Sequence, residues 1–262
     1  MKTGASTACF YPLETEKALT QVIELGFEKA EVFMNAPCEL EKPFLKRLNG
    51  IVSGSGTEIV SVHPFSSFLE SSCIFGDYER RFNDYIGLYQ QTCYAAAELG
   101  ARFVVIHGAV AQPKIPIPDE RYFERFKMLI ELGRREGVTV CQENVNKFKS
   151  QSIDFCKKMR AALGSDYNMV FDIKQSVRAG EDPFEFINEF AGEIVHMHIS
   201  DNGEAGDCLP IGKGNFSFKK LKAVLDSFGY GGDCVIEIYS KNYDVKSVLK
   251  ESKVHLDRLW QM

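Results

Sequence analysis

The segment GVTVCQENVNKFKSQSIDFCKKMRAALGSDYNMVFD, residues 137–172, carries one complete strand–helix–strand pattern. Its two ends, 138–143 and 168–172, are short runs rich in apolar and β-branched residues, which is typical of buried strands. Between them, the stretch 150–163 predicts a helix with one buried stripe, because apolar residues recur every three or four positions: Ile153, Cys156, Met159, Ala162 and Leu163. This unit predicts two parallel strands joined by a helical crossover.

The same alternation continues in both directions along the chain. Strands are predicted at 3–9, 28–33, 58–63, 102–107, 138–143, 168–172, 194–199 and 233–239. Helices are predicted after each of them, at 14–25, 39–53, 79–99, 119–136, 150–163, 183–190, 217–228 and 243–260. Eight such units in 262 residues suit an α/β protein with a single (β/α)8 TIM barrel spanning 1–262. A doubly wound open sheet is the alternative.

Composition narrows the class of protein. Hydrophobic residues make up 45% and charged residues 26% of the chain, which is an ordinary globular balance. The net charge of −5 argues against a surface that neutralises nucleic acid, so we expect no nucleic-acid partner. No apolar signal core or membrane-spanning run occurs, and the eight cysteines are scattered without a C-x-x-C pair. We therefore expect a cytoplasmic protein with reduced thiols and no membrane partner.

The loops predicted after the strands differ in length. Those after the third, fourth and seventh strands, about 64–77, 108–118 and 200–216, are long, whereas the turns that lead from helix to strand are short. In a barrel the long loops would all lie at the C-terminal mouth, where barrel active sites are found.

Acids and imidazoles close six of the eight predicted strands. They are His63, His107, Glu143, Asp172, His198 and Glu237. Side chains alternate along a strand, so each shares its inward direction with the residue two positions earlier: Val105, Cys141, Val170, His196 and Val235 are examples. A closed barrel would therefore direct these six side chains toward one central point.

Three carboxylates in one buried space would repel each other, and a divalent cation removes that repulsion. We expect one such ion, held by Glu143, Asp172, His198 and Glu237. Carboxylate and imidazole ligands suit manganese or zinc best, and also cobalt or magnesium. We predict that His63 and His107 contact substrate or a second metal, with hydrogen-bonded core histidines as the alternative. His196 is expected to be structural, one layer below.

Five motifs resemble the xylose-isomerase-like barrel superfamily over essentially the whole chain. They are Gln142-Glu-Asn144, Phe171-Asp-Ile173, His196-Met-His-Ile-Ser-Asp201, Leu209-Pro-Ile-Gly-Lys-Gly214 and Val235-Ile-Glu237. That superfamily includes sugar epimerases and isomerases, hydroxypyruvate isomerase, inosose and dehydroshikimate dehydratases, and endonuclease IV. The resemblance implies that the four strand-end residues hold one metal, and that Glu143 and Glu237 also exchange protons with the substrate.

The chain departs from parts of that pattern. Endonuclease IV carries ligands for a third zinc where this sequence has Gln175, Gly206 and Cys208, so a three-metal phosphodiesterase is disfavoured. The resemblance also implies that His63 and His107 match ligands of another metal, which leaves a two-metal site open. In ketohexose epimerases the position of Gln175 is a histidine that contacts sugar hydroxyls. A glutamine can still hydrogen-bond a hydroxyl, so Gln175 is a candidate substrate residue.

Cations near the predicted mouth are further candidates. Gly212-Lys213-Gly214 would bring a lysine and backbone N–H groups to an anionic substrate group, because glycine permits close approach. The alternative is a tight turn with a solvated lysine. Lys174 and Arg178 follow the sixth strand and are also placed to meet a phosphate or carboxylate.

The predicted function is metal-dependent isomerisation or epimerisation of a small sugar or hydroxy-carbonyl compound. One glutamate would remove a proton to form an enediolate, and the other would return it. A dehydratase or lyase is the nearest alternative, with His63 or His107 as the acid. DNA repair and a non-catalytic sugar-binding barrel are further alternatives, and the intact glutamate pair counts against the second. The sequence leaves open whether the chain forms a homo-oligomer.

Overall fold

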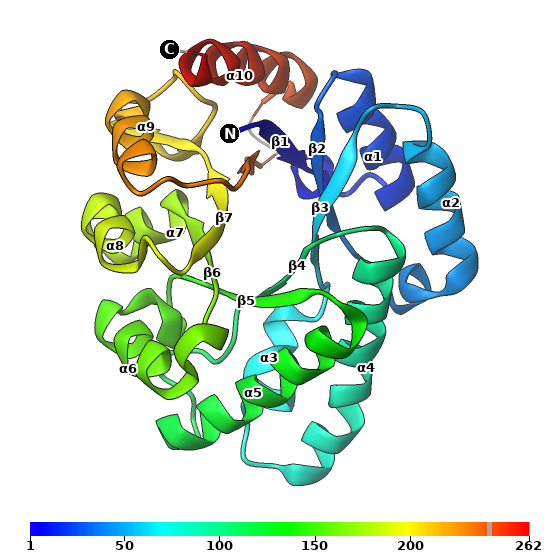
Figure 1. Ribbon diagram of the computed structural model, residues 1–262, viewed down its shortest axis with the longest axis vertical. Helices are drawn as coiled ribbons and strands as arrows, with labels where there is room; N and C mark the ends of the chain where they lie inside the picture. Colours follow the sequence, from blue (N-terminus) through cyan, green and yellow to red (C-terminus); the bar gives the residue numbers. More distant parts are fainter. Residues whose placement is uncertain (240–242, 262) are drawn as a thin grey trace.

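Eight parallel strands form a closed barrel in the computed structural model, which describes residues 1–239 and 243–261. In chain order they are β1 (Thr3–Ser6), β2 (Lys29–Phe33), β3 (Glu58–His63), β4 (Phe103–Ile106), β5 (Thr139–Glu143), β6 (Met169–Asp172), β7 (Ile194–Ile199) and β10 (Cys234–Ile236). Strand β1 pairs in parallel with both β2 and β10, which closes the ring (Figure 1). The predicted barrel is confirmed, and the open sheet is excluded.

Helices form the outer ring of the barrel in Figure 1. Those predicted from the sequence appear as α1 (Thr15–Glu24), α2 (Lys42–Val52), α4 (Glu79–Glu98), α5 (Asp119–Glu136), α6 (Ile153–Leu163), α8 (Pro183–Phe190), α9 (Phe218–Ser227) and α10 (Val245–Trp260). None of the helices in the described ranges is long and apolar enough to cross a membrane. All eight cysteines are free thiols, and only Cys38 is exposed.

Several short elements were not predicted. They are α3 (Ser67–Cys73), α7 (Ile173–Ala179), the hairpin of β8 (Asp201–Gly203) and β9 (Gly206–Leu209), and the single turns η1 (Thr7–Phe10), η2 (Pro37–Leu40), η3 (Lys149–Gln151) and η4 (Gly164–Asp166). The first strand is shorter than predicted, because the Ser6 side chain accepts a hydrogen bond from the Ala8 N–H and starts η1. Elements α3, α7 and the β8–β9 hairpin all follow strand ends and so lie at the C-terminal mouth.

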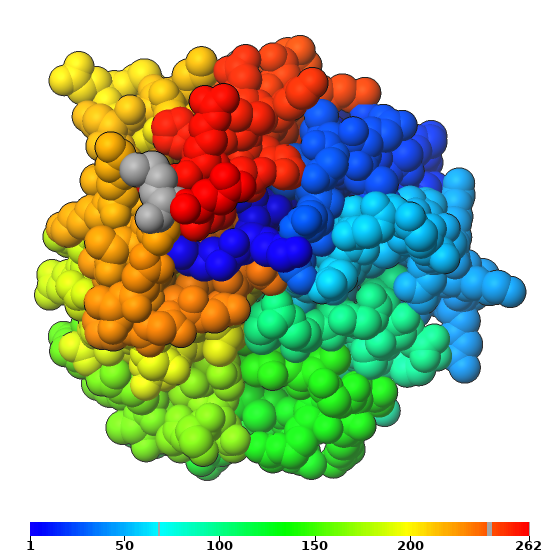
Figure 2. Space-filling view, turned by 45° about the horizontal axis from the view of Figure 1, so that its top comes forward, coloured from blue at the N-terminus to red at the C-terminus, as the bar shows by residue number. Residues whose placement is uncertain are grey.

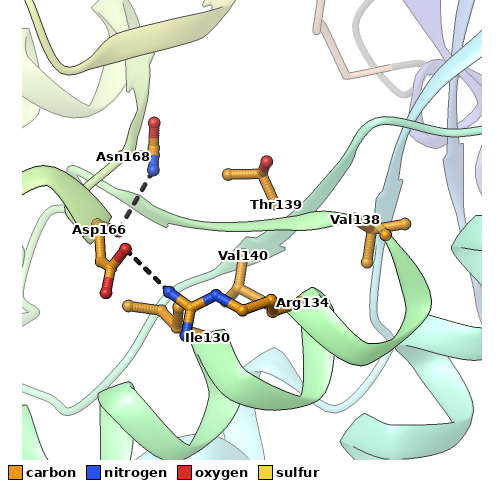
Figure 3. Close-up of a pocket in the computed structure, with 8 residues that line it drawn as sticks. Ile130, Arg134, Val138, Thr139, Val140, Asp166 and Asn168 are labelled. Carbon is orange, nitrogen blue, oxygen red and sulfur yellow. Dashed lines mark hydrogen bonds and ion pairs between the residues drawn. The ribbon is translucent and has the colours of Figure 1, made fainter.

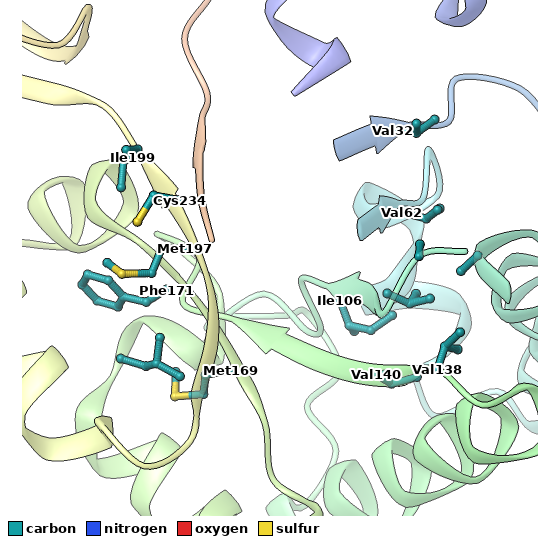
Figure 4. Packing of buried hydrophobic residues seen from close by; sticks show 14 of the residues in the cluster. Val32, Val62, Ile106, Val138, Val140, Met169, Phe171, Met197, Ile199 and Cys234 are labelled. Atoms are coloured by element: carbon teal, nitrogen blue, oxygen red, sulfur yellow. The ribbon is translucent and has the colours of Figure 1, made fainter. Parts of the chain in front are cut away.

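Two apolar sets follow the alternation of the strands. Outward-facing strand residues pack against the helices on opposite sides of the barrel, as Figure 4 shows: Val32, Val62, Ile106, Val140, Met169, Phe171, Met197, Ile199 and Cys234. Inside the barrel a separate small cluster consists of Phe103, Val105, Cys141 and Val170. Because strand side chains repeat every two residues, the next inward positions on β4, β5 and β6 lie one step closer to the mouth.

The two ends of the described chain meet at the seam of the barrel. The Lys2 carbonyl accepts a hydrogen bond of 3.1 Å from the Cys234 N–H. The Trp260 ring N–H, on the last helix, donates to Thr3 Oγ1 at 3.1 Å. Figure 2 shows the first residues, in blue, against the red C-terminal helix. These contacts join the first and last units, as closure of the barrel requires.

Candidate metal centre

The four predicted ligands come together at the C-terminal mouth of the barrel. Glu143 ends β5, Asp172 ends β6, His198 lies near the end of β7, and Glu237 follows β10. One ligand atom from each lies within 4.8 Å of the others. His198 Nδ1 is 3.3 Å from Glu143 Oε1, 3.7 Å from Glu237 Oε2 and 4.0 Å from Asp172 Oδ2. Three carboxylates therefore surround one imidazole nitrogen.

Side-chain hydrogen bonds fix the strand ends that carry this cluster. The Asn144 amide donates to the Asp172 carbonyl at 3.0 Å and accepts from the Asp172 N–H at 2.6 Å, which clamps β5 to β6. The Gln142 amide donates to the Ile106 and His107 carbonyls at 3.1 and 2.9 Å. The motif Gln142-Glu-Asn144 thus holds Glu143 between two residues that bind its neighbouring strands.

A fourth acid, the buried Glu31 on β2, was not predicted to belong to the site. Its Oε2 lies 2.8 Å from His198 Nε2, so the ring N–H at Nε2 donates to this carboxylate and Nδ1 faces the cluster. Ser61 Oγ also donates to Glu31 at 2.8 Å, and His196 Nε2 lies 3.7 Å away. His196 is fully buried, in the structural layer predicted for it.

Glu31 and His198 stabilise each other's charged forms. Burial raises the pKa of Glu31, but the charge on His198 and hydrogen bonds from His196 and His198 offset burial and hold that pKa well below its usual value. Burial lowers the pKa of His198, but Glu31 and Glu143 together raise it well above its usual value. The His198 ring therefore carries a proton that a metal at Nδ1 would displace.

Two further imidazoles lie on one side of Glu143. His107 Nε2 is 2.9 Å from Glu143 Oε2, and His63 Nε2 is 3.7 Å from the same oxygen. The two histidines approach each other to 2.9 Å through their Nε2 atoms. Burial raises the pKa of Glu143, but the charge and hydrogen bond of His107, with hydrogen bonds from His198 and His63, bring it well below its usual value. We call His63, His107 and Glu143 the imidazole side.

A buried lysine lies on the other side of the cluster. Lys174 Nζ is 2.7 Å from Glu237 Oε2 and 3.1 Å from Asp172 Oδ2, with only 2% of its side chain exposed. We call Lys174, Asp172 and Glu237 the ammonium side. Helix α7 begins directly after Asp172, whose Oδ1 accepts the Gln175 N–H at 3.2 Å. The expectation that Lys174 faces an anionic substrate group is not met, because two carboxylates of the cluster already bind it.

Burial and the charges on the ammonium side together shift the pKa values of Lys174, Glu237 and Asp172. Burial lowers the pKa of Lys174, but Asp172 and Glu237 outweigh burial and raise it well above its usual value. Burial raises the pKa of Glu237, yet Lys174 and His198 bring it below its usual value. Burial also raises the pKa of Asp172, to about 6.

Comparison with known proteins assigns the chain to a family. Residues 19–259 match the family model described as xylose isomerase-like TIM barrel. The chain belongs to this family. An uncharacterized protein of Mycobacterium leprae is 22% identical over 263 residues, covering 91% of this chain and 89% of its own. An inosose dehydratase of Clostridium beijerinckii is 23% identical over 255 residues, covering 85% and 81%.

Solved structures share the fold of this xylose isomerase-like barrel. A D-tagatose 3-epimerase-like protein superposes with a TM-score of 0.79 at 22% identity, covering 100% of this chain and 97% of its own. The 3-keto-D-glucoside 4-epimerase of E. coli also gives 0.79, at 17% identity and 100% coverage of both chains. At this identity the superpositions show a common fold alone, and both neighbours carry names of sugar epimerases.

The donor set of this xylose isomerase-like chain fits a divalent ion. Carboxylates and one imidazole nitrogen are ligands that manganese and zinc accept. Oε2 of Glu143 and Oδ2 of Asp172 are buried without a well-aligned hydrogen bond within the described ranges. Nitrogens of His107 and Lys174 do lie 2.9 and 3.1 Å from these oxygens, so the oxygens have polar neighbours but free coordination capacity.

The glycine-rich loop of this barrel is folded around Asp201. Its Oδ2 accepts the N–H groups of Gly212 and Gly214, both at 2.9 Å. Lys213 between them pairs with Glu251 at 3.3 Å, and 58% of its side chain is exposed. The two glycine amides are therefore occupied, which matches the tight turn rather than an anion cradle. A substrate contact by Lys213 stays a prediction.

The remaining candidates near the mouth have partners of their own. Gln175 Oε1 accepts the Asn146 N–H at 3.1 Å, which leaves its amide N–H groups for another partner. Arg178 binds both oxygens of Asp207, each at 2.7 Å, so its charge is compensated. Cys208 is buried, and its thiol donates to the Glu237 carbonyl at 3.6 Å.

A cavity at the opposite end of the barrel is separate from this site. It measures about 280 Å³ and lies beside the start of β5 and the residues before β6 (Figure 3). Arg134 pairs there with Asp166 at 2.9 Å. Strands β5 and β6 carry Glu143 and Asp172 at their other ends, so this cavity has no contact with the cluster.

Proposed function

We propose that this chain is a metal-dependent sugar epimerase or isomerase in which Glu143 and Glu237 transfer protons at a carbon beside a carbonyl. The observation that carries the proposal is the position of the two carboxylates. They come from different strands, and they approach the same His198 nitrogen to 3.3 and 3.7 Å. A substrate bound to a metal ion at His198 Nδ1 would lie between the carboxylates of Glu143 and Glu237, and both are able to exchange protons.

Glu143, Asp172, His198 and Glu237 would hold the ion. When bound, a divalent ion would polarise a carbonyl and an adjacent hydroxyl and lower the cost of the enediolate. Glu143 would then exchange a proton on one face of the substrate carbon, and Glu237 on the other. We expect one tightly bound ion per chain, manganese or zinc, and at most a weaker second ion at His63, His107 and Glu143.

An uncharged sugar is the substrate class that the surroundings of the site favour. Among the described residues near the mouth, Lys174, Arg178 and Lys213 each pair with carboxylates of the chain. Structural neighbours include a D-psicose 3-epimerase and an L-ribulose 3-epimerase. We propose that the free amide N–H groups of Gln175 bind a sugar hydroxyl. Lys213 is a weaker candidate than Gln175 for a substrate contact, because its ion pair with Glu251 holds it on the surface.

A dehydratase is the second candidate function. Two inosose dehydratases are among the relatives, at 23% and 24% identity. Expulsion of water needs an acid near the leaving hydroxyl. His107 meets that need, because it contacts Glu143 at 2.9 Å and 21% of its side chain is exposed. The same carboxylate pair would serve the proton-abstraction step in both reactions.

Isotope exchange distinguishes these reactions. The manganese-loaded protein is incubated in D₂O with D-tagatose, D-allulose, L-ribulose, a 3-keto-glucoside and inosose. We expect deuterium to enter a carbon beside the carbonyl, together with an epimer or isomer of unchanged formula. Deuterium exchange with loss of water would favour the dehydratase. Binding of a sugar without any exchange would contradict both and support the non-catalytic barrel.

A further inference from the structure

Lys174 lies where a metal centre has no obvious need of a second cation. Its Nζ contacts Glu237 Oε2 at 2.7 Å and Asp172 Oδ2 at 3.1 Å. These two oxygens are also among the atoms that face His198 Nδ1. The lysine therefore shares its binding partners with the proposed ion, although neither the sugar chemistry nor the ligand set calls for it.

Burial of this ammonium is costly and needs compensation. A charged group removed from water loses its favourable hydration, and close ion pairs must offset that loss. Lys174 meets that cost with two carboxylates and with the ring of Tyr239, whose centre is 5.2 Å from Nζ. Asp172 caps the N-terminus of α7, which holds the lysine backbone beside the cluster. The position is thus built into the fold and is not one rotamer of a surface chain.

We infer that Lys174 is a counter-ion built into the metal centre, which holds Asp172 and Glu237 together without metal and opposes the divalent ion that binds them. The inference rests on the proposed metal-dependent function. Charge supports it within the ligand set, because the three ligand carboxylates balance one divalent ion and one ammonium, whereas either cation alone leaves them with net negative charge.

Metal binding to variants of the full chain tests the inference. Mn²⁺ and, separately, Zn²⁺ are titrated calorimetrically into EDTA-stripped wild-type protein, Lys174→Met and Lys149→Met. Methionine keeps a similar length without charge. Two cations that bind the same pair of buried carboxylates repel each other, so we expect Lys174→Met to bind the ion at least about tenfold more tightly. Lys149 is the matched control, because it also pairs closely, with Asp119 at 2.6 Å, but outside the cluster. Its variant should retain wild-type affinity.

Thermal unfolding provides the second measurement. In EDTA, Lys174→Met should unfold at a lower temperature than the wild type, because Asp172 and Glu237 lose their partner. Saturating Mn²⁺ should raise the unfolding temperature of Lys174→Met by more than it raises that of the wild type. A merely structural lysine would lower both temperatures and leave the metal increment unchanged.

Three outcomes decide the question. Tighter binding by Lys174→Met, with the control unchanged, supports the inference. Equal or weaker binding overturns it, as does a complete lack of Mn²⁺ and Zn²⁺ binding in both proteins. Should the methionine variant fail to fold, Lys174→Gln replaces it with the same expected direction. Because metal affinity is measured without substrate, an inactive sugar panel would count against the proposed function and leave this result standing.

Discussion

The imidazole side and the ammonium side surround the same cluster with different chemistry. Glu143 is buried among the imidazoles of His63, His107 and His198, which hold the pKa of its carboxyl well below its usual value against the effect of burial. Glu237 keeps 15% of its side chain exposed and contacts a lysine that holds its charge firmly. The comparison teaches that the two proposed bases are not equivalent. Both carboxyls are held in the ionised form, but Glu143 contacts the partly exposed imidazole of His107 at 2.9 Å, whereas Glu237 contacts the buried ammonium of Lys174 at 2.7 Å.

Removal of either carboxylate should have the largest effect. Glu143→Gln and Glu237→Gln should each lower turnover by at least about 100-fold at saturating metal, the usual scale of a lost general base. The amide keeps the shape and one ligating oxygen, so metal should still bind. Asp172→Asn is the control, and it should weaken metal binding more than it lowers turnover of the loaded protein. Near wild-type turnover in either glutamine variant would make that glutamate a ligand only.

Glu31 binds His198, the imidazole that the carboxylates of both sides approach, so its substitution tests whether the two sides depend on one support. Glu31→Gln should weaken Mn²⁺ binding by about 10- to 100-fold, because the carboxylate orients His198 through its Nε2 hydrogen bond. Calorimetric titration measures this effect. Ser61→Ala is the milder control, since Ser61 contacts Glu31 but not His198. Unchanged affinity in Glu31→Gln would show that His198 is held by packing alone.

The sequence was sufficient to predict the barrel and the meeting of its strand ends. Alternation along β4, β5 and β6 gives the inward cluster of Val105, Cys141 and Val170, and the next inward residues are polar. Closure then brings together side chains far apart in the chain. That argument needs only strand direction and period, which apolar patterns report well.

The same reasoning missed Glu31 and the direction of Lys174. Glu31 lies in the middle of β2, so a search of strand ends passed over it. Its signal was an acid at an inward position between the outward-facing Ala30 and Val32. The contact of Lys174 depends on α7 starting directly after its cap residue Asp172, and apolar periodicity does not report such a cap. Long flexible side chains take their direction from such local turns.

Metal affinity should decrease as the pH is lowered, and protonation of Asp172 on the ammonium side should make this decrease steeper. Binding at Nδ1 displaces the proton that His198 holds through its raised pKa, which predicts about tenfold weaker binding per pH unit. The pKa of Asp172 is raised to about 6, so below that pH this second ligand also becomes protonated and metal affinity falls further. Mn²⁺ titrations between about pH 5 and 8 measure the slope. A flat profile would exclude His198 Nδ1 as a ligand. A constant slope through pH 6 would remove the contribution of Asp172.

The smallest effect concerns a buried acid that supports the imidazole side from behind. Glu70 on α3 accepts hydrogen bonds from the Gly108 N–H, next to His107, and from the Tyr89 hydroxyl. Burial raises the pKa of Glu70 to about 8, although both hydrogen bonds lower it. Between the ordinary value of 4.5 and 8 the folded chain therefore holds a proton that the unfolded chain releases. The stability contributed by this group is complete below 4.5 and is lost as the pH rises toward 8.

Glu70→Gln tests this dependence, because glutamine keeps the shape of the protonated acid and cannot ionise. Its oxygen can accept the Gly108 N–H, and its amide can donate to Tyr89, whose hydroxyl also contacts Ser66 at 3.0 Å. The free energy of unfolding of the variant should rise relative to wild type by about 1–3 kcal/mol between about pH 5 and 8.5. Denaturant titrations at both pH values measure the difference.

Glu58→Gln is the control for lost charge. Its exposed carboxyl has a pKa lowered by the hydrogen bond and charge of Lys29, so its effect should not increase in the same direction. A difference between Glu70→Gln and wild type that is the same at both pH values would mean that Glu70 is ionised throughout. The imidazole side would then rest on a buried carboxylate, as the ammonium side does.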